Sequence, residues 1–137
     1  MTIKIQHTFI PHTDAEDSLA FYRDVLGFEL RNDVGYGDMR WLTMGSADQG
    51  DTAIVLTPPA VDPSITEEER RVILELIAKG SFASLILATD DLAGMFERVE
   101  ASGADILQEP MDQDWGVRDC AFRDPAGNTV RLQQLPA

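Results

Sequence analysis

The chain has 137 residues, of which 44% are hydrophobic, and this suffices for one domain or for two small modules that share a core. No run of apolar residues approaches the roughly 20 that a membrane-spanning helix needs, so we expect no membrane partner. With 24 acidic and 11 basic side chains the net charge is −13, which repels phosphate groups and argues against a nucleic-acid partner.

The first part of the chain predicts one strand, one helix and three further strands. Residues 3–10 alternate as a strand, and Thr13 with Glu16 resembles a capping box that opens a helix ending at Gly27. The next strands are predicted at 28–34, 39–44 and 52–57. The chain enters the first strand without the basic, apolar and small-residue pattern of a secretion signal, so we expect a cytoplasmic protein.

The same order of elements returns after a connector. A proline-rich stretch at 58–63 leads to a helix at 66–79, which Thr66 and Glu69 open as a second capping box. The predicted elements after this helix are a strand at 82–88, a helix at 90–101, and strands at 105–108, 118–123 and 129–133. The order is again βαβββ.

Landmarks of the two halves recur at a nearly constant offset. Asp90 and Gly103 lie 76 residues after Asp14 and Gly27, and position 127 is a glycine 77 residues after another at position 50. We therefore predict an α+β fold of tandem βαβββ modules. The predicted divisions are a first module at 1–57, a connector with its helix at 58–81, and a second module at 82–137.

The last two strands predict a hairpin with one apolar and one polar face. Residues 124–128, Asp-Pro-Ala-Gly-Asn, have the chemistry of a tight turn. Pairing across this turn places four apolar residues on one face: Cys120, Phe122, Val130 and Leu132. The opposite face carries Asp119 and Arg131 as diagonal neighbours, which predicts either an internal ion pair or an arginine that clamps a carboxylate or carbonyl oxygen.

Three segments resemble the vicinal oxygen chelate superfamily, also called the glyoxalase, bleomycin-resistance and extradiol dioxygenase group. They are Phe-Tyr-Arg-Asp-Val-Leu-Gly-Phe at 21–28, Trp-Gly at 115–116, and the turn at 124–128. The resemblance implies that the curved mixed sheets of the two modules surround a cleft, in which up to four side chains hold a divalent metal. The corresponding positions here are His7, Ile54, Ala83 and Arg131, and of these only the histidine is a metal ligand. We therefore predict no metal and no cofactor.

The resemblance also implies where a ligand would lie. Strict alternation in the first module predicts that Trp41 packs against the helix and that its neighbours face the cleft. Trp115, in the loop before the hairpin, would stand at the mouth and stack on a flat ligand. The predicted ligand-binding residues are His7, Phe9, Arg40, Leu42, Ile54, Trp115, Asp119 and Arg131.

These expectations favour a metal-free protein that binds a small organic molecule, in the manner of proteins that sequester a drug or metabolite. We expect a homodimer, because a curved sheet covering half a cleft leaves apolar surface for a second copy. The alternative is a cofactor-free isomerase or lyase that acts on a small carbonyl compound, with His7 as the proton carrier. A third reading is an interaction protein with a vestigial cleft.

Overall fold

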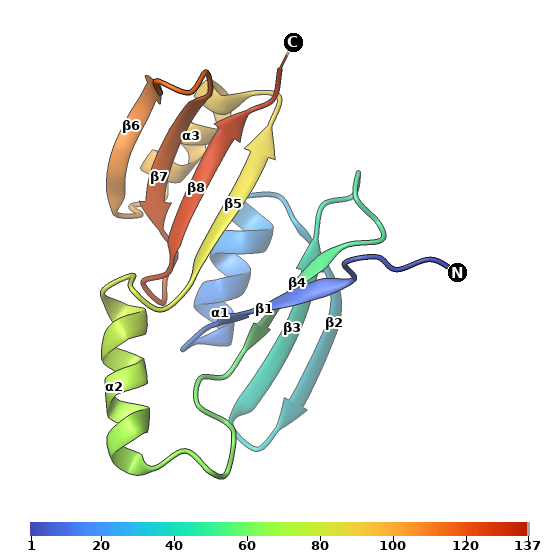
Figure 1. The fold of residues 1–137 in the computed structure, drawn as a ribbon, viewed down its shortest axis with the longest axis vertical. Helices are drawn as coiled ribbons and strands as arrows, with labels where there is room; N and C mark the ends of the chain where they lie inside the picture. The colour runs from blue at the N-terminus through green and yellow to red at the C-terminus, as the bar shows by residue number, and fades with distance from the viewer. Residues whose placement is uncertain (137) are drawn as a thin grey trace.

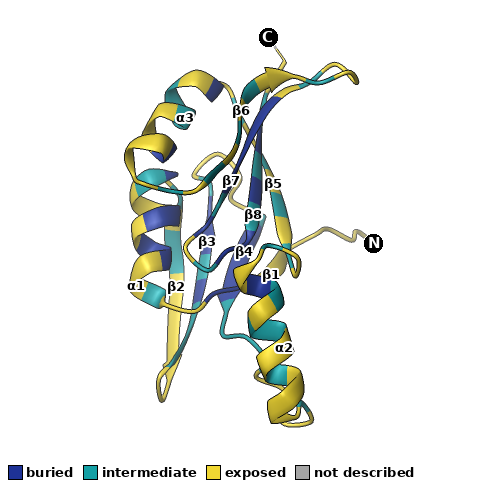
Figure 2. Cartoon of the chain, turned by 90° about the vertical axis from the view of Figure 1, so that its left-hand side faces the viewer, coloured by how far each residue is buried: buried dark blue, intermediate teal, exposed yellow. Residues whose placement is uncertain are grey.

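Two four-stranded sheets lie side by side in a computed structural model that describes residues 1–136, with α1 and α3 on one side of both (Figures 1 and 2). Sheet A contains the first four strands: β1 (His7–Pro11), β2 (Glu29–Tyr36), β3 (Met39–Gly45) and β4 (Ala53–Thr57). Sheet B contains the last four: β5 (Ser84–Thr89), β6 (Ile106–Asp112), β7 (Arg118–Arg123) and β8 (Thr129–Gln134). The strand orders, β1-β4-β3-β2 and β5-β8-β7-β6, are equivalent.

The helices complete two βαβββ modules, which confirms the predicted fold class. Helix α1 (Ala15–Ser18) continues as the π-helical segment η1 (Leu19–Val25) after β1, and α3 (Leu92–Ala101) follows β5. Between the modules, α2 (Glu67–Ala78) stands apart from the other helices at one end of the molecule (Figure 1). The division at 1–57, 58–81 and 82–137 stays a prediction, and its last residue, Ala137, lies outside the described residues.

Each module opens its helix with an aspartate and closes it with a glycine. Asp14 accepts a hydrogen bond from the backbone N–H of Asp17 at 2.9 Å, so the predicted capping box beginning one residue earlier is wrong. Asp91 accepts the equivalent bond from Gly94 at 3.0 Å. The closing glycines, at positions 27 and 103, have φ of 84° and 85°, a region where a Cβ is disfavoured. In α2 the predicted capping box of Thr66 and Glu69 is confirmed.

The helix-facing sides of both sheets contribute to one hydrophobic core. Phe21 of η1 and Phe122 of β7 meet edge to face with ring centroids 5.8 Å apart, so the first module's helix packs on the second module's sheet. The predicted pairings of Cys120 with Leu132 and of Phe122 with Val130 are confirmed, and all four side chains are buried. Burial raises the pKa of the Cys120 thiol to about 11, which makes it unreactive at neutral pH.

The β7–β8 turn ties the two modules together. The Asp124 carboxylate accepts a hydrogen bond from the Tyr22 hydroxyl at 2.6 Å and three more from backbone N–H groups of its own turn. Asn128 donates to the carbonyl of Pro11, at the end of β1, at 2.7 Å. Asp124 and Asn128 are both buried, so this turn fixes sheet B against the first module as well as reversing the chain.

Candidate functional site

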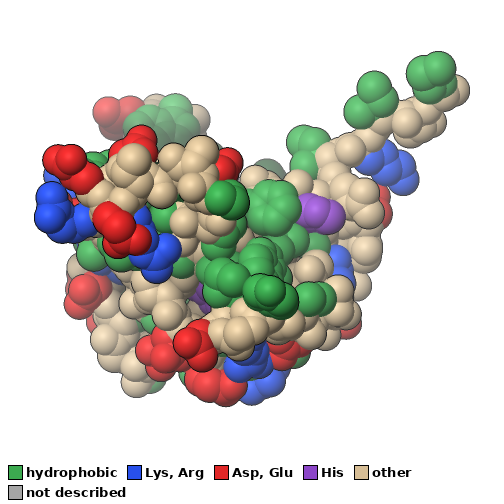
Figure 3. All heavy atoms as spheres, turned by 90° about the horizontal axis from the view of Figure 1, so that it is seen from below, with side chains coloured by type: hydrophobic (Ala, Val, Ile, Leu, Met, Phe, Trp, Pro, Cys, Tyr) green, Lys and Arg blue, Asp and Glu red, His purple; other side chains and the backbone are tan. Residues whose placement is uncertain are grey.

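The two sheets each have a side without helices, here called the helix-free face, and the structure places candidate ligand-binding residues there. In sheet A, alternation from the buried core residues puts His7, Phe9 and Val55 on this face. The Phe9 side chain is 59% exposed, and its ring meets that of His7 edge to face at 5.7 Å. In sheet B the matching strand β5 presents Ile86, which is 63% exposed. The side chains of Phe9 and Ile86 are therefore available for contact, whereas Val55 is buried. Figure 3 shows hydrophobic side chains gathered next to a histidine on the surface.

Strand pairing corrects the predicted correspondence between the modules. Phe9 pairs with Val55 in sheet A, and Ile86 pairs with Arg131 in sheet B, both across parallel neighbours. The counterpart of Arg131 is therefore Val55 and not Ile54. By the same register, His7 corresponds to Ser84 and not to Ala83. A shift of one residue matters because it moves a side chain to the other face of the sheet.

The prediction that Leu42 and Ile54 face the cleft is wrong. Both lie in the core beneath the helices, and Leu42 is fully buried. Trp41 consequently lies on the helix-free face and is only partly buried, contrary to the predicted core position. The sequence of β3 carries large apolar side chains in both phases, with Met39 and Trp41 in one and Leu42 and Met44 in the other, so alternation alone did not decide the face.

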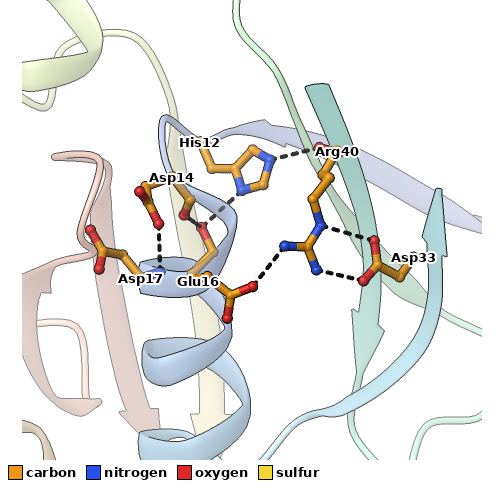
Figure 4. Close-up of polar contacts among 7 residues, drawn as sticks. His12, Asp14, Glu16, Asp17, Asp33 and Arg40 are labelled. Atoms are coloured by element: carbon orange, nitrogen blue, oxygen red, sulfur yellow. Dashed lines mark hydrogen bonds and ion pairs between the residues drawn. The ribbon is translucent and has the colours of Figure 1, made fainter. Parts of the chain in front are cut away.

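Arg40 also points to the helix side, where it connects the start of α1 to β2 and β3 (Figure 4). Its guanidinium donates to Glu16 at 2.7 Å and, through two nitrogens, to Asp33 at 2.6 and 3.2 Å. The hydrogen bond from Arg40 holds the pKa of the Asp33 carboxyl below its usual value. His12 lies beside this cluster, 2.8 Å from the Arg40 carbonyl and 2.9 Å from the Ser18 hydroxyl. The predicted cleft position of Arg40 is wrong.

The helix-free face of sheet B carries a buried polar cluster centred on Asp119. Its carboxylate accepts hydrogen bonds from Gln108 and Gln113, both at 2.9 Å, and from Arg131 at 3.1 Å. The predicted ion pair is therefore present. Burial raises the pKa of the Asp119 carboxyl, but the bonds from Gln113, Gln108 and Arg131 outweigh it, so the pKa lies below its ordinary value. We call these four residues the Asp119 cluster.

Trp115 stands on the turn between β6 and β7 and is connected to the Asp119 cluster. The turn is closed by a hydrogen bond from the backbone N–H of Gln113 to the carbonyl of Val117 at 2.8 Å, and Gly116 has φ of 94°. The indole at its tip is 70% exposed. Because the side chain of Gln113 bonds to Asp119, the cluster orients this turn as well as Arg131.

Several hollows lined by the described residues are large enough to hold small molecules. One of about 590 Å³ lies at the start of β1 and is lined by His7, Thr43 and Ala53 of the helix-free face. A second, of about 790 Å³, lies between the modules and is lined by core residues such as Ile54 and Leu87 and also by Ile86 of the helix-free face. A third, of about 610 Å³, adjoins the turn at 124–127. Of these three hollows, only the one between the modules is lined by Ile54.

The positions at which the resemblance implies a metal do not suit one. On the corrected register they are His7, Val55, Ser84 and Arg131, which supply one imidazole, a hydrocarbon, a hydroxyl and a cation. Transition metals require more nitrogen, sulfur or carboxylate donors than this set offers. Within residues 1–136, no grouping of three or more histidine, cysteine, aspartate or glutamate side chains has the spacing of a metal site. Freedom from metal stays a prediction.

Sequence reasoning missed several members of these faces. Val55 and Ile86 went unnamed because the repeat was aligned one residue out of phase, and Trp41 was assigned to the helix side because strand alternation was counted in the wrong phase. A signal existed: the helix-opening aspartates at 14 and 91 lie 77 residues apart, and this offset places His7 on Ser84. Gln108 and Gln113 carried no recognisable motif. Their side chains meet Asp119 because irregular pairing between β6 and β7 shifts the register there.

Comparison with known proteins gives consistent matches over nearly the whole chain. Residues 4–132 match the family model of the Glyoxalase/Bleomycin resistance protein/Dioxygenase superfamily. The crystal structure of UcmS2 is similar with a TM-score of 0.84 and 33% identity, covering 98% of this chain and 100% of that one. TnmS3, an antibiotic binding protein from Streptomyces sp. CB03234, gives 0.73 and 28%, with 99% of each chain covered.

A curated relative extends this result to another organism. The uncharacterized protein YurT of Bacillus subtilis (strain 168) is 27% identical over 132 residues, which is 96% of this chain and 99% of that protein. Among the described residues no helix has the length and apolar character needed to cross a membrane. The match over residues 4–132 and the tandem βαβββ architecture lead to one conclusion: this chain belongs to the glyoxalase/bleomycin resistance protein/dioxygenase superfamily.

Proposed function

We propose that the protein binds a planar small organic molecule on the helix-free faces of its sheets and sequesters it without converting it. The observation that carries this proposal is the combination of exposed apolar side chains, Phe9 and Ile86, with a buried polar cluster on the same side of the molecule. Ligand pockets typically combine apolar walls with a few fixed polar groups. The antibiotic-binding name of one structural neighbour supports the same class of ligand.

The energetics assign most of the affinity to apolar contact. Covering an exposed aromatic or aliphatic side chain is worth about 1.5–3 kcal/mol when burial is complete, and a stacked indole contributes on the order of 1 kcal/mol more. Phe9, Ile86 and Trp115 offer such contacts. The net charge of −13 adds attraction for a ligand with a cationic group.

We further propose that the protein acts as a metal-free cytoplasmic homodimer. Among the described residues, strands β1 and β5 each pair with a single neighbour, so each leaves a free edge beside an exposed apolar side chain, Phe9 in β1 and Ile86 in β5. A second copy could cover these faces and turn two half-clefts into closed sites. Sedimentation at micromolar concentration should give the dimer mass, and a monomer would contradict this part of the proposal.

The binding proposal can be tested by titration with a panel of planar antibiotics and carbonyl metabolites, followed by tryptophan fluorescence and calorimetry. We expect at least one compound to bind, and Phe9→Ala to weaken it by about tenfold through lost apolar contact. Val72→Ala is the matched control, because Val72 is also an exposed apolar residue but lies on α2. Equal weakening by both variants would contradict a site at Phe9.

One observation favours the enzymatic alternative. His7, which lies on the helix-free face, also lines the hollow of about 590 Å³, where it could transfer a proton to or from a small carbonyl compound. If a bound compound is converted to a product and His7→Gln abolishes this conversion, sequestration is contradicted and an isomerase or lyase activity is supported. Sequestration predicts that every bound compound is recovered unchanged from both proteins.

A further inference from the structure

The guanidinium of Arg131 is held from one side only. Within residues 1–136, the guanidinium forms its hydrogen bonds with one terminal nitrogen, Nη1, which donates to Asp119 at 3.1 Å and to Gln108 at 3.0 Å. A guanidinium has five N–H donors in a fixed planar fork, so the edge formed by Nε and Nη2 keeps donors for another partner. The side chain is 33% exposed, so part of it is open to a ligand.

The charge around Arg131 selects the kind of partner. The fully buried Asp119 carboxylate balances the guanidinium, and both Asp119 oxygens already accept hydrogen bonds from the cluster. The pair therefore presents directed N–H donors with little net charge. The protein as a whole carries a charge of −13, which opposes the approach of an anion. An uncharged oxygen acceptor, such as a ketone or amide carbonyl, can accept hydrogen bonds from these donors and is not repelled by the negative charge of the protein.

The same cluster positions an aromatic surface. Gln113 donates to the Asp119 carboxylate from the turn that carries Trp115, so indole and guanidinium are anchored to one buried group. An indole stacks on the flat face of an aromatic ligand, whereas a guanidinium edge bonds to an oxygen in the plane of that ligand. The two kinds of contact use different parts of a planar ligand, its face and its edge.

We infer that Arg131 is a ligand-binding residue that receives an uncharged carbonyl oxygen attached to a planar aromatic ligand. This inference rests on the proposed function and narrows the ligand to aromatic ketones and amides. Arg131 occupies a position at which the family resemblance implies a metal ligand. In this protein its Nε and Nη2 donors bind the ligand oxygen directly. The Asp119 cluster acts as a positioning group that holds this edge outward.

The test compares three probes of one shape by calorimetry: 2-acetylnaphthalene, 2-ethylnaphthalene and 2-naphthoate. We expect the ketone to bind about tenfold more tightly than the ethyl compound, because one charge-assisted hydrogen bond distinguishes them. We expect the carboxylate to bind more weakly than the ketone. A carboxylate that binds more tightly than the ketone would overturn the assignment of an uncharged acceptor.

Arg131→Lys separates ligand binding from a structural role. Lysine keeps a cation opposite Asp119 but lacks the planar fork, so the advantage of the ketone over the ethyl compound should fall to about twofold or less. Arg118→Lys is the control, since Arg118 lies on the adjacent part of sheet B and pairs with Asp112 at the exposed surface. An advantage that survives Arg131→Lys unchanged would overturn the inference.

A second variant covers the case in which Arg131→Lys does not fold. The double variant Arg131→Met with Asp119→Asn removes both charges together and leaves no unpaired buried ion. It should bind 2-ethylnaphthalene as the parent does and lose the preference for the ketone. If the parent protein binds none of the three probes or the panel compounds, the proposed function fails; if all three probes bind the parent equally, only the inference about Arg131 fails.

Discussion

The two sheets have the same strand order and core positions but opposite chemistry on their helix-free faces. Strand pairing makes Trp41 and Val55 of sheet A equivalent to Asp119 and Arg131 of sheet B. One module therefore presents an apolar pair where the other presents an ion pair. The duplicated backbone leaves these positions free to differ because they do not contribute to the shared core, and their difference creates a surface with an apolar half and a polar half.

The largest expected effect concerns the core, which the two modules share. Phe122→Ala should lower the free energy of unfolding by about 3–5 kcal/mol, because a fully buried ring is lost and a cavity remains. Phe9→Ala, on the exposed helix-free face, should lower it by less than about 0.5 kcal/mol. Chemical denaturation measures both. Similar losses would mean that Phe9 is part of the core and that the two sides of the sheet are not distinct.

The next largest loss of stability is expected from a substitution in the turn that precedes β8, compared with the same substitution in the turn that precedes β4. A Cβ at Gly127 would lie 2.5 Å from the carbonyl oxygen of Ala78, and its φ of 109° disfavours any side chain. Gly127→Ala should therefore cost about 2–4 kcal/mol. At Gly50 a Cβ would meet nothing within 4 Å, so Gly50→Ala should be nearly neutral. Equal melting temperatures for the two variants would show that Gly127 does not pack closely against the end of α2.

A smaller effect is expected on the polar face of sheet B. The folded-state pKa of Asp119 lies below its ordinary value, so its carboxylate contributes stability above about pH 4, and this contribution is lost as the pH falls through the lowered pKa. Asp119→Asn should cost about 1–2 kcal/mol at pH 7 and flatten the stability profile on the acid side. Parallel profiles for variant and parent would show that Asp119 is not held as a carboxylate.

The smallest expected effect is on metal affinity. Arg131→Glu restores a carboxylate at the position where the resemblance implies a ligand, but Val55 and Ser84 remain poor donors. Elemental analysis after mild chelation should therefore find no stoichiometric transition metal in either parent or variant. One equivalent of iron, zinc, manganese or nickel in the parent would contradict the predicted absence of a metal site.

Sequence patterns predicted the parts of this structure that repeat or alternate without ambiguity. The hairpin of β7 and β8, the capping box at Thr66 and the ion pair of Arg131 with Asp119 follow from spacing and strand period. Failures occurred where a single residue of phase decides the face, as at Ile54. The Asp119 cluster was only partly predictable, because Gln108 reaches it through an irregular strand pairing that no sequence pattern marks.

The central claim is that a planar ligand occupies the helix-free faces and not the hollow between the modules. Trp41 and Trp115 are the chain's two tryptophans, and both indoles lie outside the core, whereas Leu87 lines the hollow between the modules. The most direct measurement is an NMR titration that follows the two indole N–H signals, assigned with Trp41→Phe, together with the methyl signals of Leu87. We expect 2-acetylnaphthalene to shift the indole signals and leave the Leu87 methyls unchanged. Shifted Leu87 methyls with unchanged indole signals would contradict the claim.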